Sequence, residues 1–282
     1  MSGNPWHFTT HDLGYHYREL ISDVLQNGDT VKPRGMAVKE VRPLYLTLLN
    51  PQQCLTFRPQ INRALMWMEI AQILAGDFNA ELFNAISPLA SKLLTAGGAY
   101  GPRTALQLTH LIQEMTDDPD SRRAIVYIGR PDDLSRVRAG GTTDQPCTAT
   151  WQFFSRNGKL EMAVNMRSWD LVWGLANDIP CFVSVQMAVA AALGLEVGPY
   201  YHVAGSGHIY ERHWDLVDSI RAEGGKSLPS VGSTDGDTPS ERWTSTVHDA
   251  VSAVRAAHLR DWGSMPVQWR EAGALWKKKI DG

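Results

Sequence analysis

One part of the chain concentrates side chains that could carry out nucleophilic and acid–base chemistry. It contains Pro146-Cys147, Arg167-Ser168-Trp169-Asp170, Gly174 to Asp178 and Gly205 to Tyr210, and upstream lie Glu69, Tyr100 and Arg122-Arg123. A cysteine thiolate is a nucleophile, carboxyl and phenol groups transfer protons, and arginines bind anions. Taken singly, each has a plainer interpretation, because a lone cysteine is more often a buried, inert thiol and paired arginines more often form a solvated face. The order and spacing of the set therefore carry more weight than any single member.

The composition of the 282 residues excludes several classes of protein. Hydrophobic residues make up 43% and charged residues 20%, which is typical of a globular chain and excludes a disordered chain, a coiled coil and a collagen-like fibre. The net charge is −3 and the sequence pI about 6.3, so no broad basic surface indicates polymeric nucleic acid or anionic lipid. A phosphorylated ligand would have to be bound by a few placed arginines.

The cysteines and histidines do not predict a metal site. Cys54, Cys147 and Cys181 form no CxxC pair, so neither a disulfide framework nor a zinc site is expected. His202, His208 and His213 have spacings that do not share one helix face. The N-terminal residues lack the pattern of a signal peptide, and we expect a protein of the reducing cytoplasm.

The longest apolar stretch, residues 179–195, is interrupted by Pro180, Ser184 and Gln186. It is too short and too polar to span a bilayer. We therefore expect a buried core helix and no association with a membrane.

The periodicity of the sequence predicts a mixed α+β fold. Strands and helices alternate without the strict order of parallel βαβ units, and Asn157-Gly158 predicts a hairpin turn between two strands. We expect one domain over residues 1–282, with a polar loop at 129–145 and a surface excursion at 223–241. The predicted helices are 12–26, 59–75, 80–94, 103–114, 178–193, 208–222, 242–258 and 267–280, and the predicted strands are 42–49, 123–128, 148–154, 159–166 and 197–204.

Together, these motifs resemble thymidylate synthases and the nucleotide hydroxymethylases related to them. The resemblance is strong from residue 61 to 214 and weaker from 34 to 59. It rests on Glu69 seven residues before Gly76-Asp77-Phe78-Asn79, on Asp120-Ser121-Arg122-Arg123, Pro146-Cys147, Gln152-Phe153 and His208-Ile209-Tyr210, and on Arg-Ser-x-Asp-x-x-x-Gly-Leu from Arg167. It implies a mixed β-sheet packed by helices, with the sheet at a dimer interface.

The resemblance implies how a pyrimidine nucleoside monophosphate is bound and activated. The thiolate of Cys147 adds to position 6 of the ring, which turns position 5 into a nucleophile. Arg167 lowers the pKa of that thiol and binds the phosphate, with Ser168 beside it. The resemblance implies further phosphate ligands: Arg34 of the same chain, and Arg122 and Arg123 from the other subunit of an obligate homodimer. It also implies that His208 and Tyr210 bind the sugar hydroxyl.

The resemblance also implies a folate co-substrate, 5,10-methylenetetrahydrofolate, and no metal. Asp170 holds the pterin and Gly174 belongs to the same subsite. Glu69 organises water and moves protons, and Tyr100 assists removal of the proton from position 5.

Asp178 stands where synthases that act on uracil usually carry asparagine. An amide offers one donor and one acceptor, which match O4 and N3–H of uracil, whereas an ionised carboxylate repels O4. A carboxylate accepts from the exocyclic amine of cytosine and, if one proton is shared, also satisfies N3 and activates position 6. Asp at this position is typical of the cytidylate hydroxymethylases of the superfamily. The alternative is that Asp178 only caps the helix that follows it.

In those hydroxymethylases water, instead of hydride from the folate, captures the covalent methylene intermediate. Here Thr148, Met166 and Ala176-Asn177 replace the His, Gln and Pro-Phe that synthases commonly have. The C-terminal sequence Lys277 to Gly282 lacks the apolar tail with which synthases close over folate. Each change fits a site that is more open to water.

Small residues near the expected sugar, Ala176, Gly205 and Gly207, favour room for a 2′-hydroxyl group. The sequence is also similar to the CMP hydroxymethylases of nucleoside-antibiotic pathways (the MilA type), so CMP is the predicted substrate and 5-hydroxymethyl-CMP the product. The alternatives are dCMP hydroxymethylation, a thymidylate synthase that methylates dUMP, and a retired enzyme that only binds nucleotide or RNA. The complete set of Cys147, Glu69, Arg167 and Asp170 argues against the last.

Overall fold

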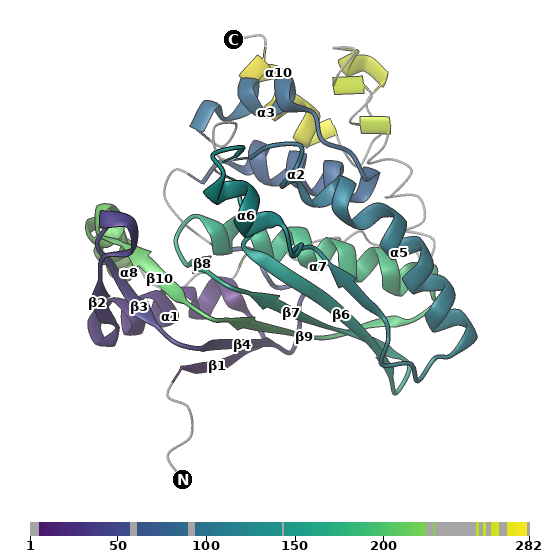
Figure 1. The fold of residues 1–282 in the computed structure, drawn as a ribbon, viewed down its shortest axis with the longest axis horizontal. Coiled ribbons are helices and arrows are strands. Elements are labelled where there is room, and N and C mark those ends of the chain that lie inside the picture. The colour runs from purple at the N-terminus through teal and green to yellow at the C-terminus, as the bar shows by residue number, and fades with distance from the viewer. Residues whose placement is uncertain are drawn as a thin grey trace.

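The computed structural model describes residues 6–56, 61–89, 94–142, 144–223, 228, 252–253, 256–257, 261–264 and 270–280. Its strands form two mixed sheets, one of six strands and one of four, and helices pack against them (Figure 1). The predicted α+β class is confirmed.

The six-stranded sheet has the order β1-β4-β9-β7-β6-β5. Pairs β1/β4 and β7/β9 are parallel and the other three pairs are antiparallel. Asn157 and Gly158 close the predicted hairpin with φ values of 54° and 74°, in the left-handed region that Asn and Gly tolerate best. The strands are β1 His7–Thr10, β4 Leu44–Leu48, β5 Ile125–Tyr127, β6 Thr148–Arg156, β7 Lys159–Met166 and β9 Glu196–Ala204.

Helices α7 (Gly174–Ala192) and α5 (Tyr100–Asp117) pack on one face of this sheet, and α2 (Arg63–Ala75) packs on both of them (Figure 1). Burial alternates along β9, so that Tyr200 and His202 face the helices while Val197, Tyr201 and Val203 keep part of their surface exposed on the other face. In the view of Figure 1 the described residues place no helix below the sheet. Among the residues that the structure describes, no helix therefore covers this face of the sheet, which we call its open face.

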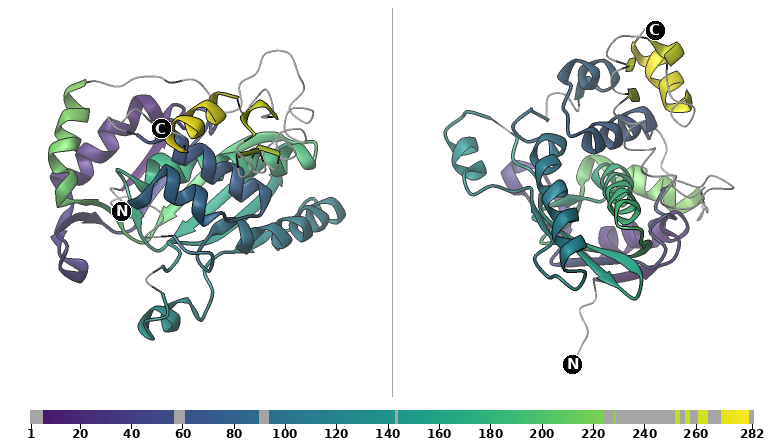
Figure 2. Two further views of the ribbon diagram at one scale, coloured as in Figure 1. Left: turned by 90° about the horizontal axis from the view of Figure 1, so that it is seen from above. Right: turned by 90° about the vertical axis from the view of Figure 1, so that its right-hand side faces the viewer.

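The four-stranded sheet has the order β2-β3-β10-β8 and continues directly from the larger sheet. β7 runs into β8 and β9 runs into β10, so that Asp170 and His208 become paired neighbours on parallel strands. Helices α1 (Leu13–Asn27) and α8 (Trp214–Glu223) pack side by side next to this sheet (Figure 2). The strands are β2 Asp29–Val31, β3 Val38–Val41, β8 Trp169–Asp170 and β10 Gly207–Tyr210.

Several predicted boundaries were wrong. The helix expected from residue 208 begins at Trp214, because residues 207–210 form β10 against β3. The helix expected over residues 80–94 is interrupted at Ser87. Helix α3 (Ala80–Ile86) ends there because Pro88 favours an extended conformation at Ser87, and residues 88–89 are helical again. Inside the polar loop expected at 129–145 lies a short helix, α6 (Asp133–Arg138), which stands away from the sheet (Figure 2).

The C-terminal part of the chain is only partly described. The last predicted helix is observed as α10, Arg270–Ile280. Apart from residues 223, 228, 252–253 and 256–257, the surface excursion at 223–241 and the helix predicted at 242–258 lie outside the described residues.

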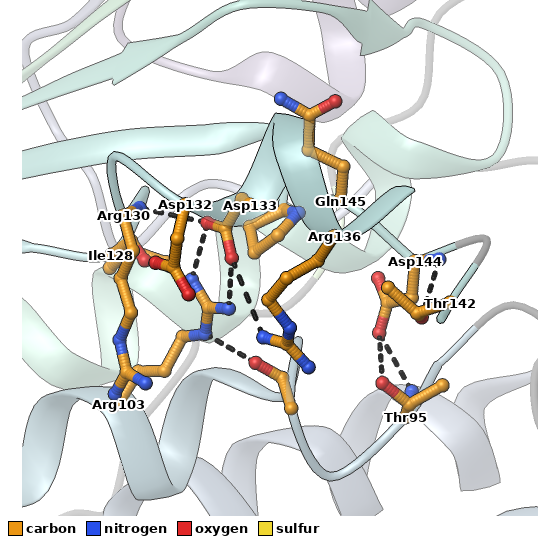
Figure 3. Close-up of polar contacts among 12 residues, drawn as sticks. Thr95, Arg103, Ile128, Arg130, Asp132, Asp133, Arg136, Thr142, Asp144 and Gln145 are labelled. Atoms are coloured by element: carbon orange, nitrogen blue, oxygen red, sulfur yellow. Dashed lines mark hydrogen bonds and ion pairs between the residues drawn. The ribbon is translucent and has the colours of Figure 1, made fainter. Parts of the chain in front are cut away.

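A buried ion pair ties α6 to α5 (Figure 3). Both amino groups of Arg103 donate to the Asp133 carboxylate, at 2.8 Å and 2.6 Å, and its Nε donates to the Gly97 carbonyl at 2.7 Å. The guanidinium beside it lowers the pKa of Asp133. A second tie joins Asp144 to the backbone and hydroxyl of Thr95, at 2.7 Å and 3.0 Å. Together the two ties hold residues 94–103 against the chain that leads to Cys147.

We expect Asp133→Asn to destabilise the protein by about 3–5 kcal/mol, because it leaves the Arg103 guanidinium, which is 2% exposed, without its counter-charge. Urea unfolding measures the loss. The control is Asp29→Asn, which removes a surface pair with Arg42 and should change the free energy of unfolding by less than about 1 kcal/mol. Equal losses in the two variants would contradict the role assigned to the buried pair.

Candidate active site

Cys147 immediately precedes β6 and is held by Arg167 at the end of β7. The backbone N–H of Arg167 donates to the Cys147 carbonyl at 2.8 Å. Its guanidinium donates to the carbonyl oxygens of Pro146 at 3.1 Å and Gln145 at 2.8 Å. The sulfur atom therefore sits on a backbone fixed from both the main chain and the side chain of Arg167.

Arg167 lowers the pKa of the Cys147 thiol, as the sequence predicted, but the net shift of that pKa is upward. Burial is the largest cause, and Asp178 and Asp144 add to it, while Arg167 and Arg34 only partly oppose the rise. The charges of the two arginines therefore lower the pKa of the thiol, but burial raises it by more. The charge of Arg34, in the exposed Pro33–Gly35 turn, therefore acts on the sulfur, although it is the smallest of the named effects.

Glu69 on α2 and Asp178 on α7 bring two carboxyl groups into the wall of one cavity. Burial, followed by the charge of Asp178, raises the pKa of Glu69 to about 8. Burial is also the main cause that raises the pKa of Asp178 to about 7, with a smaller contribution from Asp170. Near neutral pH this pair can hold and release protons, which general acid–base chemistry requires.

Asp178 does not cap α7. The helix begins at Gly174, four residues earlier than predicted, and Trp173 occupies its cap position. Asp178 is therefore inside the helix. A Cβ atom at Gly174 would lie 3.2 Å from Oδ2 of Asp178 and 3.5 Å from Cβ of Asp170, so this glycine leaves just the space that the carboxyl occupies. The capping alternative for Asp178 was wrong.

Tyr100, the first residue of α5, connects this cavity to the cysteine. Its hydroxyl oxygen accepts a hydrogen bond from Thr148 Oγ1 at 3.0 Å, and Thr148 follows Cys147 directly. Burial and the neighbouring Asp178 and Cys147 raise the pKa of Tyr100 well above its ordinary value. The phenol therefore stays protonated at neutral pH and can donate or relay a proton.

The cavity contains about 480 Å³ of empty space, part of it continuous with solvent. Besides Glu69, Tyr100 and Asp178, its wall includes Gln72 and Asp77, together with the aromatic pair Phe78–Phe83. Gln72 is 2% exposed, and within the described part of the chain its Nε2 has no hydrogen-bond partner. Sequence reasoning missed Gln72, although it lies three residues after Glu69 and so on the same face of α2.

Asp170, His208 and Tyr210 lie together on the smaller sheet. Oδ1 of Asp170 accepts the backbone N–H groups of Val172 at 2.9 Å and Trp173 at 3.2 Å, which fixes the carboxylate. The rings of His208 and Tyr210 meet edge to face at 4.9 Å. Burial lowers the pKa of His208. The structure thus brings these three predicted site residues next to one another.

Arg122 and Arg123 are not brought to Cys147 within one chain. Phe153 donates to the Ala124 carbonyl at 2.9 Å, and Phe153 is six residues, or about 20 Å, along β6 from Cys147. Arg123 is exposed and pairs with Glu114 at 2.9 Å. Ser168, in contrast, lies between Arg167 and β8, where the two sheets join.

The small residues near the expected sugar do not leave open room. A Cβ atom at Gly207 would lie 2.6 Å from the Leu44 side chain, and one at Gly205 would lie 3.1 Å from the Arg167 carbonyl. These glycines permit close packing of strands, and Ala176 is itself 1% exposed. The argument that they make space for a 2′-hydroxyl group was wrong.

One helix of the described residues, α7, is long and apolar enough to cross a membrane, but 78% of that stretch is buried inside the structure. The predicted core helix is confirmed.

Comparison with known proteins identifies the family to which the chain is similar. The thymidylate synthase family profile matches residues 15–231. A deoxyuridylate hydroxymethyltransferase of Bacillus phage SP01 is 33% identical over 220 residues. That alignment covers 69% of this chain and 56% of the phage protein, so the chain spans little more than half of that relative's length.

The two raised carboxyl pKa values predict how stability depends on pH. The ordinary pKa values are 4.5 for Glu69 and 3.8 for Asp178, so between about pH 4 and 8 the folded chain holds protons that the unfolded chain has lost. This stabilising contribution is complete below pH 4 and decreases as pH rises, by up to about 1.4 kcal/mol per pH unit and per group.

Urea unfolding of the ligand-free protein from pH 5 to 8 measures this slope. Glu69→Gln and Asp178→Asn should each flatten it, whereas Asp29→Asn on the surface should not. A slope unchanged in both site variants would show that these carboxyls ionise normally.

Proposed function

Because the chain belongs to the thymidylate synthase family, we propose that it transfers a one-carbon unit to position 5 of a cytosine nucleotide and gives the 5-hydroxymethyl product. The choice of CMP as the nucleotide rests on the sequence resemblance alone. The observation that carries this proposal is the carboxyl group of Asp178, enclosed in the cavity wall beside Glu69. The hydroxymethyltransferase named among the relatives supports the type of product.

Asp178 suits the edge of cytosine. With a pKa of about 7, it holds a proton in about half of the molecules at neutral pH. One carboxyl oxygen accepts from the exocyclic amine, and the proton is shared between the other oxygen and N3. A proton at N3 withdraws electrons from the ring and makes position 6 more electrophilic, so that the same carboxyl selects the base and activates it.

Cys147 forms the covalent bond to the ring. Its sulfur, as the thiolate, attacks position 6, and the electron pair of the 5,6 double bond moves to position 5, which becomes the nucleophile. Arg167 and Arg34 lie close enough to stabilise the thiolate and to bind the phosphate of the nucleotide. The buried phenol of Tyr100, linked to Thr148 beside the sulfur, assists removal of the proton from position 5.

The cavity suits a flat heteroaromatic co-substrate and water. Phe78 and Phe83 offer stacked rings at 5.2 Å, and the unpartnered Nε2 of Gln72 is a donor in the wall. Methylenetetrahydrofolate, held there with Asp170 and Gly174, supplies the one-carbon unit and leaves as tetrahydrofolate. Glu69 then orients a water molecule and takes its proton as the water adds to the exocyclic methylene carbon, and Cys147 leaves position 6 to restore the ring.

A second candidate is hydroxymethylation of dUMP, the activity named for the phage relative. A protonated carboxyl with its two oxygens exchanged in role can accept from N3–H and donate to O4 of uracil. The same site therefore has two possible proton arrangements, one for each base.

Incubation of the protein with methylenetetrahydrofolate and CMP, dCMP, UMP or dUMP separately, followed by mass spectrometry, tests the proposal. We expect CMP to gain CH2O. A gain of CH2 would indicate a synthase that methylates its substrate. Product formed only from deoxynucleotides, or only from uracil nucleotides, would overturn the choice of CMP. No product from any nucleotide would overturn the proposed enzymatic activity. Cys147→Ser should abolish turnover and retain nucleotide binding.

Asp178→Asn tests the recognition of the base. The amide cannot share a proton with N3, so the ratio of kcat/KM for CMP over UMP should fall by at least about a hundredfold. Glu69→Gln serves as a control that reduces turnover with both bases. An unchanged ratio in Asp178→Asn would count against base recognition by Asp178.

We also propose a homodimer through the open face of the six-stranded sheet, with Arg122 and Arg123 reaching the phosphate of the partner's site. Their distance from Cys147 in their own chain supports this arrangement. If it holds, mixing and refolding Cys147→Ser with an Arg122→Ala/Arg123→Ala variant, each inactive alone, restores about one quarter of the activity, because half of the dimers contain one complete site. No recovery would place the arginines in their own subunit's site or outside catalysis.

A further inference from the structure

Trp169 occupies the variable position of the Arg-Ser-x-Asp motif and is 1% exposed. Its indole ring stacks face to face on the ring of His202, with 3.8 Å between centroids and 11° between planes. His202 is also 1% exposed, and its Nδ1 lies 2.8 Å from the Tyr200 hydroxyl. Burial lowers the pKa of His202 to about 3, so the ring is neutral and forms an uncharged, fixed support for the indole.

The Trp169 indole and the carboxyl of Asp178 both border Gly174. The position of a Cβ atom at Gly174 would be 3.7 Å from Trp169 Cδ1 and 3.2 Å from Asp178 Oδ2, so the two groups border the same small space. Cδ1 is bonded to Nε1, which among the described residues has no partner within normal hydrogen-bond geometry. The indole is nevertheless close enough to lower the pKa of Asp178, against the effect of burial.

An indole N–H is a donor and never an acceptor. It therefore favours a carboxyl oxygen that does not carry a proton. A carboxyl that shares one proton with a base has two arrangements, and only one of them presents the pattern that cytosine requires. A fixed donor on one oxygen removes the equivalence of the two arrangements.

We infer that Trp169, supported by the stack on His202, is the positioning residue that fixes which oxygen of Asp178 carries the proton and thereby sets the choice between cytosine and uracil. The inference rests on the proposed function for the identity of the base-binding residue. It assigns the Trp169 N–H to the unprotonated oxygen, which leaves the second oxygen with the proton that is shared with the ring nitrogen. A tryptophan that only filled the core would need its ring and not its N–H.

Trp169→Phe removes the N–H and keeps an aromatic ring for the stack. The affinities of CMP and UMP are measured by isothermal titration calorimetry without folate, so that the result does not depend on turnover. We expect the ratio of the two affinities to change by about tenfold toward equality, the usual effect of one hydrogen bond to a charged group. The matched control is Trp276→Phe, which also replaces a tryptophan that is 1% exposed. The N–H of Trp276 donates to the Ala64 carbonyl at 3.0 Å, and neither residue lines the cavity.

A ratio that is the same in Trp169→Phe and the wild-type protein overturns the inference, as does an equal change in Trp276→Phe. If Trp169→Phe does not fold, His202→Leu and His202→Phe are compared instead, because only the Leu variant removes the ring stack. A CMP/UMP affinity ratio nearer to equality in His202→Leu than in His202→Phe supports the role of Trp169. The same affinity ratio in both variants overturns it. A preference of the wild-type protein for UMP would contradict the proposed substrate. If Trp169→Phe then lost that preference, the result would still support Trp169 as the residue that sets the choice of base.

Discussion

Two largely enclosed carboxyl groups in the wall of one cavity impose the main constraint on this structure. Burial opposes the ionisation of Glu69 and of Asp178, and the charge of Asp178 opposes that of Glu69 further. Placing such groups inside a protein costs free energy, which the surrounding packing must offset. The two carboxyls come from α2 and α7, whose buried side chains join one large hydrophobic core. A pair of nearly neutral acids is therefore held where water and a nucleotide could both reach them.

The join between the two sheets provides the second half of the site. Because β7 continues into β8 and β9 into β10, the residues at the two crossings are fixed by backbone pairing on both sides. Arg167 lies at one crossing and ties the chain before Cys147 to it. The Arg103–Asp133 pair secures the opposite wall, so the cysteine and the acids are positioned by separate parts of the core.

The sequence predicted those features that depend on neighbours close along the chain. The Asn157-Gly158 turn and helix α2, with Gly76 at its end, follow from local conformational preferences. The short strands β3 and β10 could not be predicted in this way, because Glu40 and His208 pair across 168 residues. The start of α7 was missed since Pro180 inside it reads as a helix boundary. The candidate site residues were predicted from motif order. The buried Nε2 of Gln72, which has no hydrogen-bond partner among the described residues, and the Trp169–His202 stack follow only from packing.

The raised pKa of the Cys147 thiol has a consequence for the chemical durability of the protein. Oxidants and alkylating agents react with thiolates far faster than with thiols. With its proton retained at neutral pH, the sulfur is a poor target for peroxide or for adventitious electrophiles while the site stands idle. The burial that disfavours ionisation of this thiol thus also protects its sulfur from irreversible overoxidation.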